Sequence, residues 1–502
     1  MINGHATSEG TAAYAGKHRD LHFNILGKTG LTTQTAGFGC YRVSIDVPQH
    51  AEALREALLS GINLIDTSAN YVDGDAERLG GGVLTDLISS RQVNRDEIIV
   101  VSKAGYLQGR NYTLSQQRKA EGIPFQDLVL HGEGLEHCIH PDFLADQLTQ
   151  SLERLNLETL DAYLLHNPEY YLGWAEKQGI NPQTAQDEYY HRIKKAFIHL
   201  EKEVDDGRIR FYGVSSNTFP LAHSAPDFTS AGRLWDIADA ISPSHRFSIV
   251  QLPFNLLETG AVTEKNQSDG KSTLQFCREN GLGVLTNRPL NAISGSRMMR
   301  LTDLKKKRRA AYNEIIADIR RVGKSEKQLW RKILPRLDIG EGLKVRIKQQ
   351  IAIGDMLTHY WRNFGSYERW RQAKAGMFMP RVQGVLDFLT PHAKGDDELS
   401  AWMHTHPQNL DRAYDAVGSV YVEKAVQDIE AIKAKTAAAD TDWAGDRPLS
   451  QTAIRALRST AGVSSVLVGM RKTQYVADVL QELRRVTVRE DRQAAWERLT
   501  AS

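Results

Sequence analysis

The sequence predicts an α/β fold: a (β/α)8 TIM barrel with an N-terminal β-hairpin and a large helical insertion after the seventh strand. Short apolar runs alternate with amphipathic stretches over residues 21–292, which is typical of repeated βα units around a parallel sheet. Three of these runs end on the ionisable residues Asp66, Lys103 and His166. Because a parallel barrel gathers its strand ends on one face, we expect these three side chains to share a site.

The first predicted element is the hairpin, since the Gly27–Gly30 turn separates two alternating runs in LHFNILGKTGLTTQTAGFG. The strand candidates that follow are GFGCY, NLIDTS, IIVVSKA, LDAYLLH, RFYGVSS, SIVQLPFN and GVLTNRPL. Helix candidates between them include PQHAEALREALLSG, HPDFLADQLTQSLERLNL and YYHRIKKAFIHLEKEVDDG. In the second helix, apolar residues recur at helical spacing from Phe143 to Leu155.

The eighth unit appears only near the C-terminus, where LSQTAIRALRSTAG predicts a helix, SSVLVGM a strand and TQYVADVLQELRRV a closing helix. The tract before it contains five of the eight tryptophans and stripes of apolar residues at helical spacing, such as Tyr312, Ile315 and Ile319. A tract with this aromatic content should fold. We predict a helical subdomain beside the active-site mouth, with the barrel flank as the alternative.

The predicted organisation is a flexible segment at 1–20, a barrel at 21–292 and 447–490, a helical insertion at 293–446 and a C-terminal tail at 491–502. The 502-residue chain is 41% hydrophobic, enough for a large core. Its net charge of +2 gives no general attraction to nucleic acid or membranes. Three scattered cysteines, no apolar leader and no apolar run of about 18 residues favour a cytoplasmic protein.

Four residues in order suggest proton transfer to a carbonyl oxygen: Asp66 and Tyr71 in DTSANY, Lys103 in VVSKAG and His166 in YLLHNP. A tyrosine is a weak acid, with a pKa of about 10, unless a cation favours its phenolate. Lys103 is the candidate cation, and Asp66 would hold it charged. His166 would orient the same oxygen.

This set resembles the catalytic tetrad of the aldo-keto reductase family. Taken alone, each residue has an ordinary reading as a helix cap, a surface charge or a half-buried loop side chain; their order and strand-end context favour the active site. The resemblance implies an NAD(P)H-dependent oxidoreductase acting on CH–OH or C=O groups, with Tyr71 as general acid and base. It also implies that the hairpin caps the barrel bottom.

The resemblance also implies a cofactor site. No G-x-G-x-x-G or P-loop occurs in a strand-to-helix context, so a Rossmann domain is not expected. Ser216 and Asn217 match residues that hold the nicotinamide carboxamide, with Gln251 as their partner. Phe254 stands where many relatives have a tyrosine that stacks on the nicotinamide ring.

The seventh strand ends in TNRPLN instead of the family's usual Ser-Pro-Leu run, so Arg288 would pair with the pyrophosphate and Leu290 matches the leucine. After the eighth strand, four positions match the adenosine-phosphate segment. These are Gly469, Arg471, Lys472 and Asp478, the last replacing a glutamate. Two cations before a helix favour NADPH over NADH, although NADH stays open.

The residues beside the tetrad suggest the substrate class. Tyr41, Arg42, Tyr106 and Asn167 offer polar contacts and stacking faces. Such a lining would suit a sugar, a polyol or another polyhydroxylated aldehyde better than an alkyl ketone.

Other signals carry less weight. The run HGEGLEHCIH lacks the paired ligand spacing of zinc sites, so no metal is expected. The basic run Lys305–Arg309 is expected on a solvated helix face, and His404 and His406 in a loop.

A second functional class stays open: a cofactor-binding auxiliary or sensor subunit whose insertion contacts a protein partner. The intact tetrad favours an enzyme with a small-molecule carbonyl or alcohol substrate. The insertion would then be a substrate lid or a contact within a homo-oligomer.

Overall fold

The computed structural model describes residues 1–294 and 297–501. The chain forms two compact units, which are described separately. The barrel unit comprises residues 1–292 and 435–502, and the helical unit comprises residues 293–434.

Within the described residues, the barrel unit contains a closed barrel of parallel strands in which sequence neighbours pair and β15 lies between β12 and β3. The barrel strands are β3 (Ala36–Gly39), β4 (Leu64–Asp66), β5 (Ile99–Ala104), β9 (Leu160–His166), β10 (Ile209–Ser215), β11 (Phe247–Pro253), β12 (Gly283–Asn287) and β15 (Val463–Val468). The predicted (β/α)8 fold is therefore confirmed, including the late position of the last strand.

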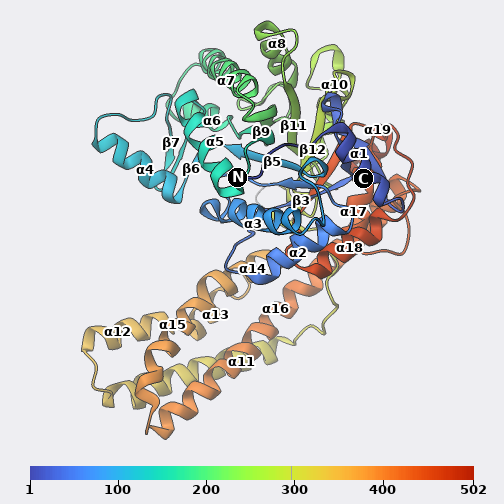
Figure 1. Ribbon diagram of the computed structural model, residues 1–502. Coiled ribbons are helices and arrows are strands. Elements are labelled where there is room, and N and C mark those ends of the chain that lie inside the picture. The colour runs from blue at the N-terminus through green and yellow to red at the C-terminus, as the bar shows by residue number, and fades with distance from the viewer. Residues whose placement is uncertain (295–296, 502) are drawn as a thin grey trace. The chain divides into compact units, whose positions relative to one another are not determined.

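Helices follow the barrel strands and surround them (Figure 1). They are α2 (Pro48–Leu59), α3 (Asp75–Ser89), α5 (Pro141–Leu155), α7 (Pro182–Asp205), α8 (Ala231–Ile241), α10 (Thr273–Glu279), α17 (Leu449–Arg458) and α18 (Thr473–Leu483). In α5 the predicted apolar stripe is the buried face, from Phe143 to Leu155. Smaller elements decorate the strand ends: α4 (Gly109–Ala120), α6 (Tyr170–Lys177), α9 (Gly260–Thr263) and the sheet of β6 (Tyr106–Leu107), β7 (Val129–Gly132) and β8 (Leu135–His137).

The predicted hairpin is present as β1 (Phe23–Ile25) paired antiparallel with β2 (Thr32–Gln34). Its turn residues Leu26 and Leu31 are buried and join the cluster of apolar side chains inside the barrel, which includes Leu64 and Leu164. The hairpin therefore closes one end of the barrel core.

The N-terminal segment differs from the expectation that residues 1–20 are flexible. It contains helix α1 (Ser8–Lys17), in which Tyr14 is buried. The backbone N–H of Ala6 donates to Asp161 Oδ1 at 2.6 Å, and Arg95 pairs with the other oxygen of that carboxylate. One buried carboxylate thus ties the segment to the barrel.

The C-terminal part also differs, because residues 491–502 were expected to be a tail. Helix α19 (Gln493–Ala501) buries Trp496, whose indole N–H donates to Thr460 Oγ1 at 2.9 Å. Trp443 packs on Trp496 with ring centroids 4.7 Å apart. This contact belongs to the barrel unit, so the insertion ends near residue 434 and not at 446.

The helical unit contains a short pair of strands, β13 (Asn291–Ser294) and β14 (Arg297–Arg300), and a set of helices, although β13 begins and α16 ends in the barrel unit. These helices are α11 (Tyr312–Gln328), η5 (Leu329–Ile333), η6 (Leu334–Arg336), α12 (Glu341–Gln350), α13 (Ile353–Tyr360), α14 (Tyr367–Ala373), η7 (Lys374–Phe378), α15 (Met379–Leu389), η8 (Thr390–Ala393) and α16 (Asp397–Ala439). Residues of α11 and the middle of α16 share one apolar cluster with Trp361 and Trp370, and Figure 1 shows the two helices side by side. The tryptophan-rich tract folds as predicted.

Two expectations for this unit were wrong. Lys305–Arg309 lie in an exposed segment before α11 and not on a helix. His404 and His406 lie in α16 and not in a loop, and His406 is fully buried against the indole of Trp402.

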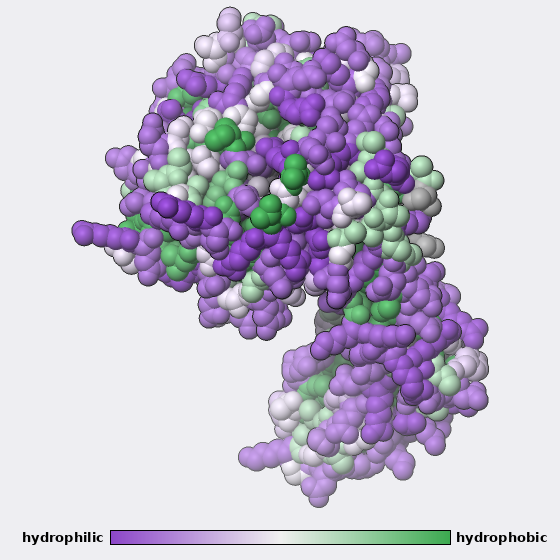
Figure 2. Space-filling model, turned by 90° about the vertical axis from the view of Figure 1, so that its right-hand side faces the viewer, coloured by the Kyte–Doolittle hydropathy of each residue, from purple (hydrophilic) through white to green (hydrophobic). Residues whose placement is uncertain are grey.

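The surface seen in Figure 2 is mostly hydrophilic, with hydrophobic residues in small, separate groups. Such scattered apolar residues are normal on a folded chain. Among the residues described, no helix has the length and apolar character needed to cross a bilayer.

Candidate active site

Asp66 and Lys103 form a buried ion pair at the C-terminal ends of two neighbouring strands, β4 and β5. Lys103 Nζ lies 2.8 Å from Asp66 Oδ2 and donates to the carbonyl oxygen of Thr67 at 2.6 Å. The Lys103 side chain has 0% of its surface exposed. A buried ammonium needs such a partner to stay charged, so Asp66 can hold a positive charge at this position.

Tyr71 begins the turn η2 (Tyr71–Gly74) that follows β4, and its ring centroid lies 5.0 Å from Lys103 Nζ. The next two residues, Val72 and Asp73, have φ of 49° and 55°. This left-handed conformation is uncommon for a β-branched residue and costs about 1–3 kcal/mol. The Asp73 carboxylate accepts the backbone N–H of Arg110 at 2.9 Å, which helps to hold the strained turn that presents Tyr71.

His166 ends β9, and its ring centroid lies 5.9 Å from that of Tyr71. Ser68 Oγ lies 3.0 Å from His166 Nδ1. Asn70 Oδ1, 2.7 Å from Ser68 Oγ, is a second acceptor for the same hydroxyl proton. When Ser68 donates to Nδ1 and not to Asn70, the imidazole keeps its proton on Nε2 and can donate there. His137 Nε2 donates to the carbonyl oxygen of His166 at 2.7 Å. A Cβ at Gly105 would lie 2.4 Å from that oxygen, so only glycine fits beside this support.

The protonation states of the three central groups differ. Burial raises the pKa of Tyr71 to about 12, and the charge of Lys103 acts in the opposite direction. Burial acts to lower the pKa of Lys103, but Asp66 and Tyr71 together outweigh it and the pKa is raised. Burial, with Lys103 and His137 nearby, holds the pKa of His166 well below its usual value. At neutral pH we expect a protonated tyrosine, a charged lysine and a neutral histidine.

This arrangement is suited to donating a proton to an oxygen that becomes negative. Tyr71 holds the proton, and Lys103 is placed to stabilise the phenolate that remains. The neutral His166 is a second hydrogen-bond donor beside it. The structure therefore brings the four sequence-predicted residues together.

Gln251 in β11 is linked to the same cluster, because its Nε2 donates to Asp66 Oδ1 at 2.7 Å. Its partner on β10 is Ser215, whose Oγ donates to Gln251 Oε1 at 3.0 Å. Ser216, predicted with Asn217 and Gln251 for the nicotinamide site, donates its backbone N–H to the Gln251 carbonyl oxygen at 3.0 Å, and its hydroxyl lies 3.0 Å from Thr218 Oγ1. Side chains alternate along a strand, so it is the Ser215 hydroxyl that meets the Gln251 side chain.

A comparison with known proteins identifies this chain's family. The sequence profile described as "Aldo/keto reductase family" matches residues 29–331, more than half of the chain. The chain belongs to the aldo/keto reductase family. The resemblance inferred from the tetrad is therefore confirmed.

Individual relatives of this aldo/keto reductase are distant. The NADH-specific methylglyoxal reductase of Escherichia coli is 22% identical over 273 residues, which cover 53% of this chain and 66% of the relative. The NADPH-dependent aldose reductase of Saccharomyces cerevisiae is 28% identical over 197 residues, which cover 37% of this chain and 50% of the relative. The chain thus spans only half to two thirds of the length of these curated relatives.

Similar solved structures include an aldo/keto reductase from Klebsiella pneumoniae in complex with NADP and acetate. It is 21% identical, has a TM-score of 0.34, and the match covers 53% of this chain and 68% of that one. The glycerol dehydrogenase from Gluconobacter oxydans is 15% identical, has a TM-score of 0.47, and the match covers 96% of this chain and 95% of that one.

Three cofactor candidates lie after β11 and β12. The ring of Phe254 is 0% exposed and packs against Trp496, with centroids 4.5 Å apart, so a stacking role stays a prediction that needs a free ring face. Arg288 has a φ of 54° and pairs with Glu258 at 2.9 Å. Leu290 is partly buried in the turn that follows. A pyrophosphate contact by Arg288 would have to share its guanidinium with Glu258.

The predicted adenosine-phosphate segment follows β15 as expected. Lys472 is the N-cap of α18, and Arg471 precedes it. A Cβ at Gly469 would meet no atom within 4 Å, so the backbone there is open. Asp478 is already engaged, because its carboxylate accepts from Ser450 Oγ at 2.8 Å and from Gln451 Nε2 at 2.7 Å. Cofactor binding by Arg471, Lys472 and Asp478 stays a prediction, and a cofactor contact of Asp478 would have to share its carboxylate with Ser450 and Gln451.

Three of the four substrate-pocket candidates join the tetrad through one connected set of contacts. The ring of Tyr41 lies 5.4 Å from that of Tyr71, and Tyr106 lies 4.7 Å from His166. Asn167 Nδ2 donates to the hydroxyl of Tyr106 at 2.8 Å. The Arg42 guanidinium lies 5.2 Å from the Tyr41 ring centroid, one step further out.

Glu169 is a buried residue near the site that the sequence reasoning missed. Its Oε1 accepts the backbone N–H of Asn217 at 2.9 Å, which fixes the turn after β10. Its Oε2 is buried without a hydrogen-bond partner among the residues described. Burial raises the pKa of Glu169 to about 7. Only its position in HNPE, three residues after His166, could have drawn attention to it.

We expect this carboxyl to make the stability of the barrel unit depend on pH. The native state binds the proton more tightly than the unfolded chain, so stability should fall as pH rises from the ordinary pKa of 4.5 to about 7. The loss would be on the order of 3 kcal/mol. Glu169→Gln keeps an oxygen acceptor for Asn217 and should flatten this slope. Urea unfolding of both proteins at several pH values in that window would show it, and parallel curves would contradict it.

No group of three histidine, cysteine or acidic side chains that could hold a metal ion occurs within residues 1–294 and 297–501. The segment with His131, His137 and Cys138 instead contacts the site through the hydrogen bond from His137 to the carbonyl oxygen of His166. His137 stacks on Tyr170 with centroids 5.4 Å apart, and Cys138 is a buried free thiol.

Proposed function

We propose that this chain is an NADP(H)-preferring oxidoreductase that interconverts a carbonyl compound and its alcohol. The observation that carries the proposal is the buried Lys103–Asp66 pair at 2.8 Å, with Tyr71 and His166 beside it. Removing a lysine ammonium from water costs free energy, and buried charged groups of this kind cluster at functional sites. A cation next to a tyrosine stabilises the phenolate that remains after the hydroxyl donates its proton to an oxygen.

A nicotinamide cofactor, held by residues such as Arg471 and Lys472, would supply the hydride for the proposed reduction. The Tyr71 hydroxyl donates its proton to the carbonyl oxygen, and the alcohol forms. Lys103 stabilises the Tyr71 phenolate until a proton returns from solvent, while His166 hydrogen-bonds the oxygen and orients it. Oxidation of an alcohol uses the same groups in reverse.

The end of β12 fits a polar cofactor. Three consecutive residues there have buried polar atoms without a partner among the residues described: Thr286 Oγ1, Asn287 Oδ1 and Arg288 Nε. Buried polar groups are rarely left unpaired unless a ligand or water completes them. A dinucleotide bound across the strand ends would supply acceptors and donors at this position.

A preference for NADP is proposed from Arg471 and Lys472, which stand before the N-terminus of α18. Both cations and the helix terminus favour a 2′-phosphate. The relatives named above differ, since one is described as NADH-specific and another as NADPH-dependent. Arg471→Ala should weaken NADPH binding by about tenfold or more, as expected for the loss of one phosphate contact, and leave NADH binding nearly unchanged.

The measurement is a titration of each nucleotide into the protein, followed by quenching of tryptophan fluorescence. Arg484→Ala is the matched control, because Arg484 caps the other end of α18 and pairs with Asp20 at the surface. An equal effect of Arg471→Ala on both nucleotides would contradict the proposed role.

For the substrate we propose a sugar or another polyhydroxylated aldehyde. Tyr41, Tyr106 and Asn167 offer aromatic faces and polar atoms around Tyr71 and His166. An alkyl substrate would leave the polar atoms of these side chains without hydrogen-bond partners, whereas the hydroxyl groups of a sugar would pair with them. We expect a higher kcat/KM for aldoses than for aliphatic aldehydes of similar size. A higher kcat/KM for the aliphatic aldehydes than for the aldoses would overturn this assignment.

A further inference from the structure

The helical unit has a cavity of its own, about 290 Å³ in volume, between the α14–η7 segment and α16. One wall is aromatic, formed by Tyr367, Trp370 and Tyr414. The volume lies near the lower end of the range for small-molecule pockets, roughly 300–1,000 Å³. One or two fused rings would fill such a space.

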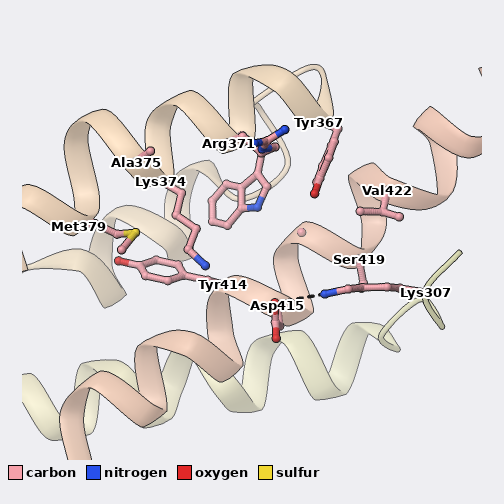
Figure 3. Close-up of a pocket in the computed structure, with 12 residues that line it drawn as sticks. Lys307, Tyr367, Arg371, Lys374, Ala375, Met379, Tyr414, Asp415, Ser419 and Val422 are labelled. Atoms are coloured by element: carbon pink, nitrogen blue, oxygen red, sulfur yellow. Dashed lines mark ion pairs between the residues drawn. The ribbon is translucent and has the colours of Figure 1, made fainter. Parts of the chain in front are cut away.

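The charges around this cavity are mostly positive. Its lining contains three cations, Lys307, Arg371 and Lys374, and one carboxylate, Asp415. Asp415 pairs with Lys307 at 3.6 Å, as the dashed line in Figure 3 shows. Arg371 and Lys374 have no ion pair among the residues described. Two cations are therefore available to a ligand.

Lys374 is directed into the cavity. Figure 3 shows its side chain ending between the two helical segments, above the ring of Tyr414, and its nitrogen lies 5.0 Å from that ring's centroid. Lys374 is also the first residue of η7, a π-helical turn. Such turns are rare and are found frequently at functional sites.

The aromatic wall also contains a hydrogen-bond donor, the indole N–H of Trp370. Trp370 is 2% exposed, and its indole N–H has no hydrogen-bond partner among the residues described. A Cβ at Gly418 would lie 2.9 Å from that nitrogen. Glycine at 418 therefore permits the indole to stand where its N–H borders the cavity.

We propose that this cavity binds a small aromatic carboxylate. The ring would lie against the aromatic wall, and the carboxylate would accept from the Lys374 ammonium, the Arg371 guanidinium and the Trp370 N–H. A bare anion would leave the aromatic wall unused, and a neutral ring would leave two cations without a partner.

Hydrogen–deuterium exchange of the full chain tests this site directly, because it locates binding by peptide. The probes are 2-naphthoate, 2-naphthamide and inorganic phosphate. We expect 2-naphthoate to slow exchange in peptides covering Tyr367–Met379 and Tyr414–Val422, and the other two probes to have little effect there. Equal protection by the amide or by phosphate would overturn the proposal, as would protection confined to barrel peptides.

Two variants sharpen the test. Lys374→Glu should weaken 2-naphthoate binding at least tenfold, whereas Lys348→Glu, on an exposed face of α12 in the same unit, should not. Gly418→Ala should have the same effect as Lys374→Glu by displacing the indole, without changing charge. Wild-type affinity in both cavity variants, with folding checked by circular dichroism, would contradict the assignment.

Discussion

Tyr71→Phe is expected to abolish most carbonyl reduction while leaving nucleotide binding intact. The substitution removes the proton that the carbonyl oxygen needs, and general acid catalysis of this kind contributes about 10²–10⁴-fold. The ring stays in place, 5.0 Å from Lys103 Nζ and 5.9 Å from His166. A fall in kcat of this size, with an unchanged Kd for NADPH, is the expected result.

The comparison variant is Tyr106→Phe, which removes a second phenol next to the same imidazole, 4.7 Å from His166. The Tyr106 hydroxyl accepts from Asn167, so we expect its loss to alter KM more than kcat. Equal losses of kcat in the two variants would mean that Tyr71 has no special role as the proton donor.

Lys103→Met is expected to cost both activity and stability. It removes the cation that stabilises the Tyr71 phenolate, and it leaves Asp66 buried with Gln251 as its remaining side-chain hydrogen-bond partner. Removing one partner of a buried ion pair destabilises a protein by about 3–5 kcal/mol. We expect a loss of kcat comparable to that of Tyr71→Phe, together with a lower denaturant midpoint for the barrel unit.

A double variant separates the two effects. Adding Asp66→Asn to Lys103→Met neutralises the stranded carboxylate, so stability should largely return while activity should not. A wild-type denaturant midpoint for Lys103→Met would contradict the claim that Lys103 and Asp66 form a buried ion pair.

The barrel strands could be predicted within three residues at either end because a strand buried on both faces is a continuous apolar run. The tetrad could be predicted because Asp66, Lys103 and His166 interrupt those runs at their ends. Even the displaced last strand was visible, since Val463–Val468 keeps the pattern after a long insertion.

Other features depend on contacts distant in sequence and could not be predicted. The first 20 residues and the last dozen are polar in composition, yet Tyr14 and Trp496 anchor them through contacts to the barrel. Ser215 and Ser216 are chemically alike, and only the strand register decides which hydroxyl meets the Gln251 side chain. Glu169 looks like an ordinary charged residue until the fold buries it beside Asn217.

The measurement that tests the central claim most directly is isotope transfer from cofactor to product. NADPH deuterated at C4, with its two stereoisomers used in parallel, is incubated with the protein and D-glyceraldehyde, and the alcohol is examined by mass spectrometry. We predict one deuterium on the carbinol carbon from one isomer, and a much lower yield from Tyr71→Phe. Nucleotide binding without deuterium transfer from either isomer, across the aldose and aliphatic panel, would contradict the claim and favour a cofactor-binding auxiliary subunit.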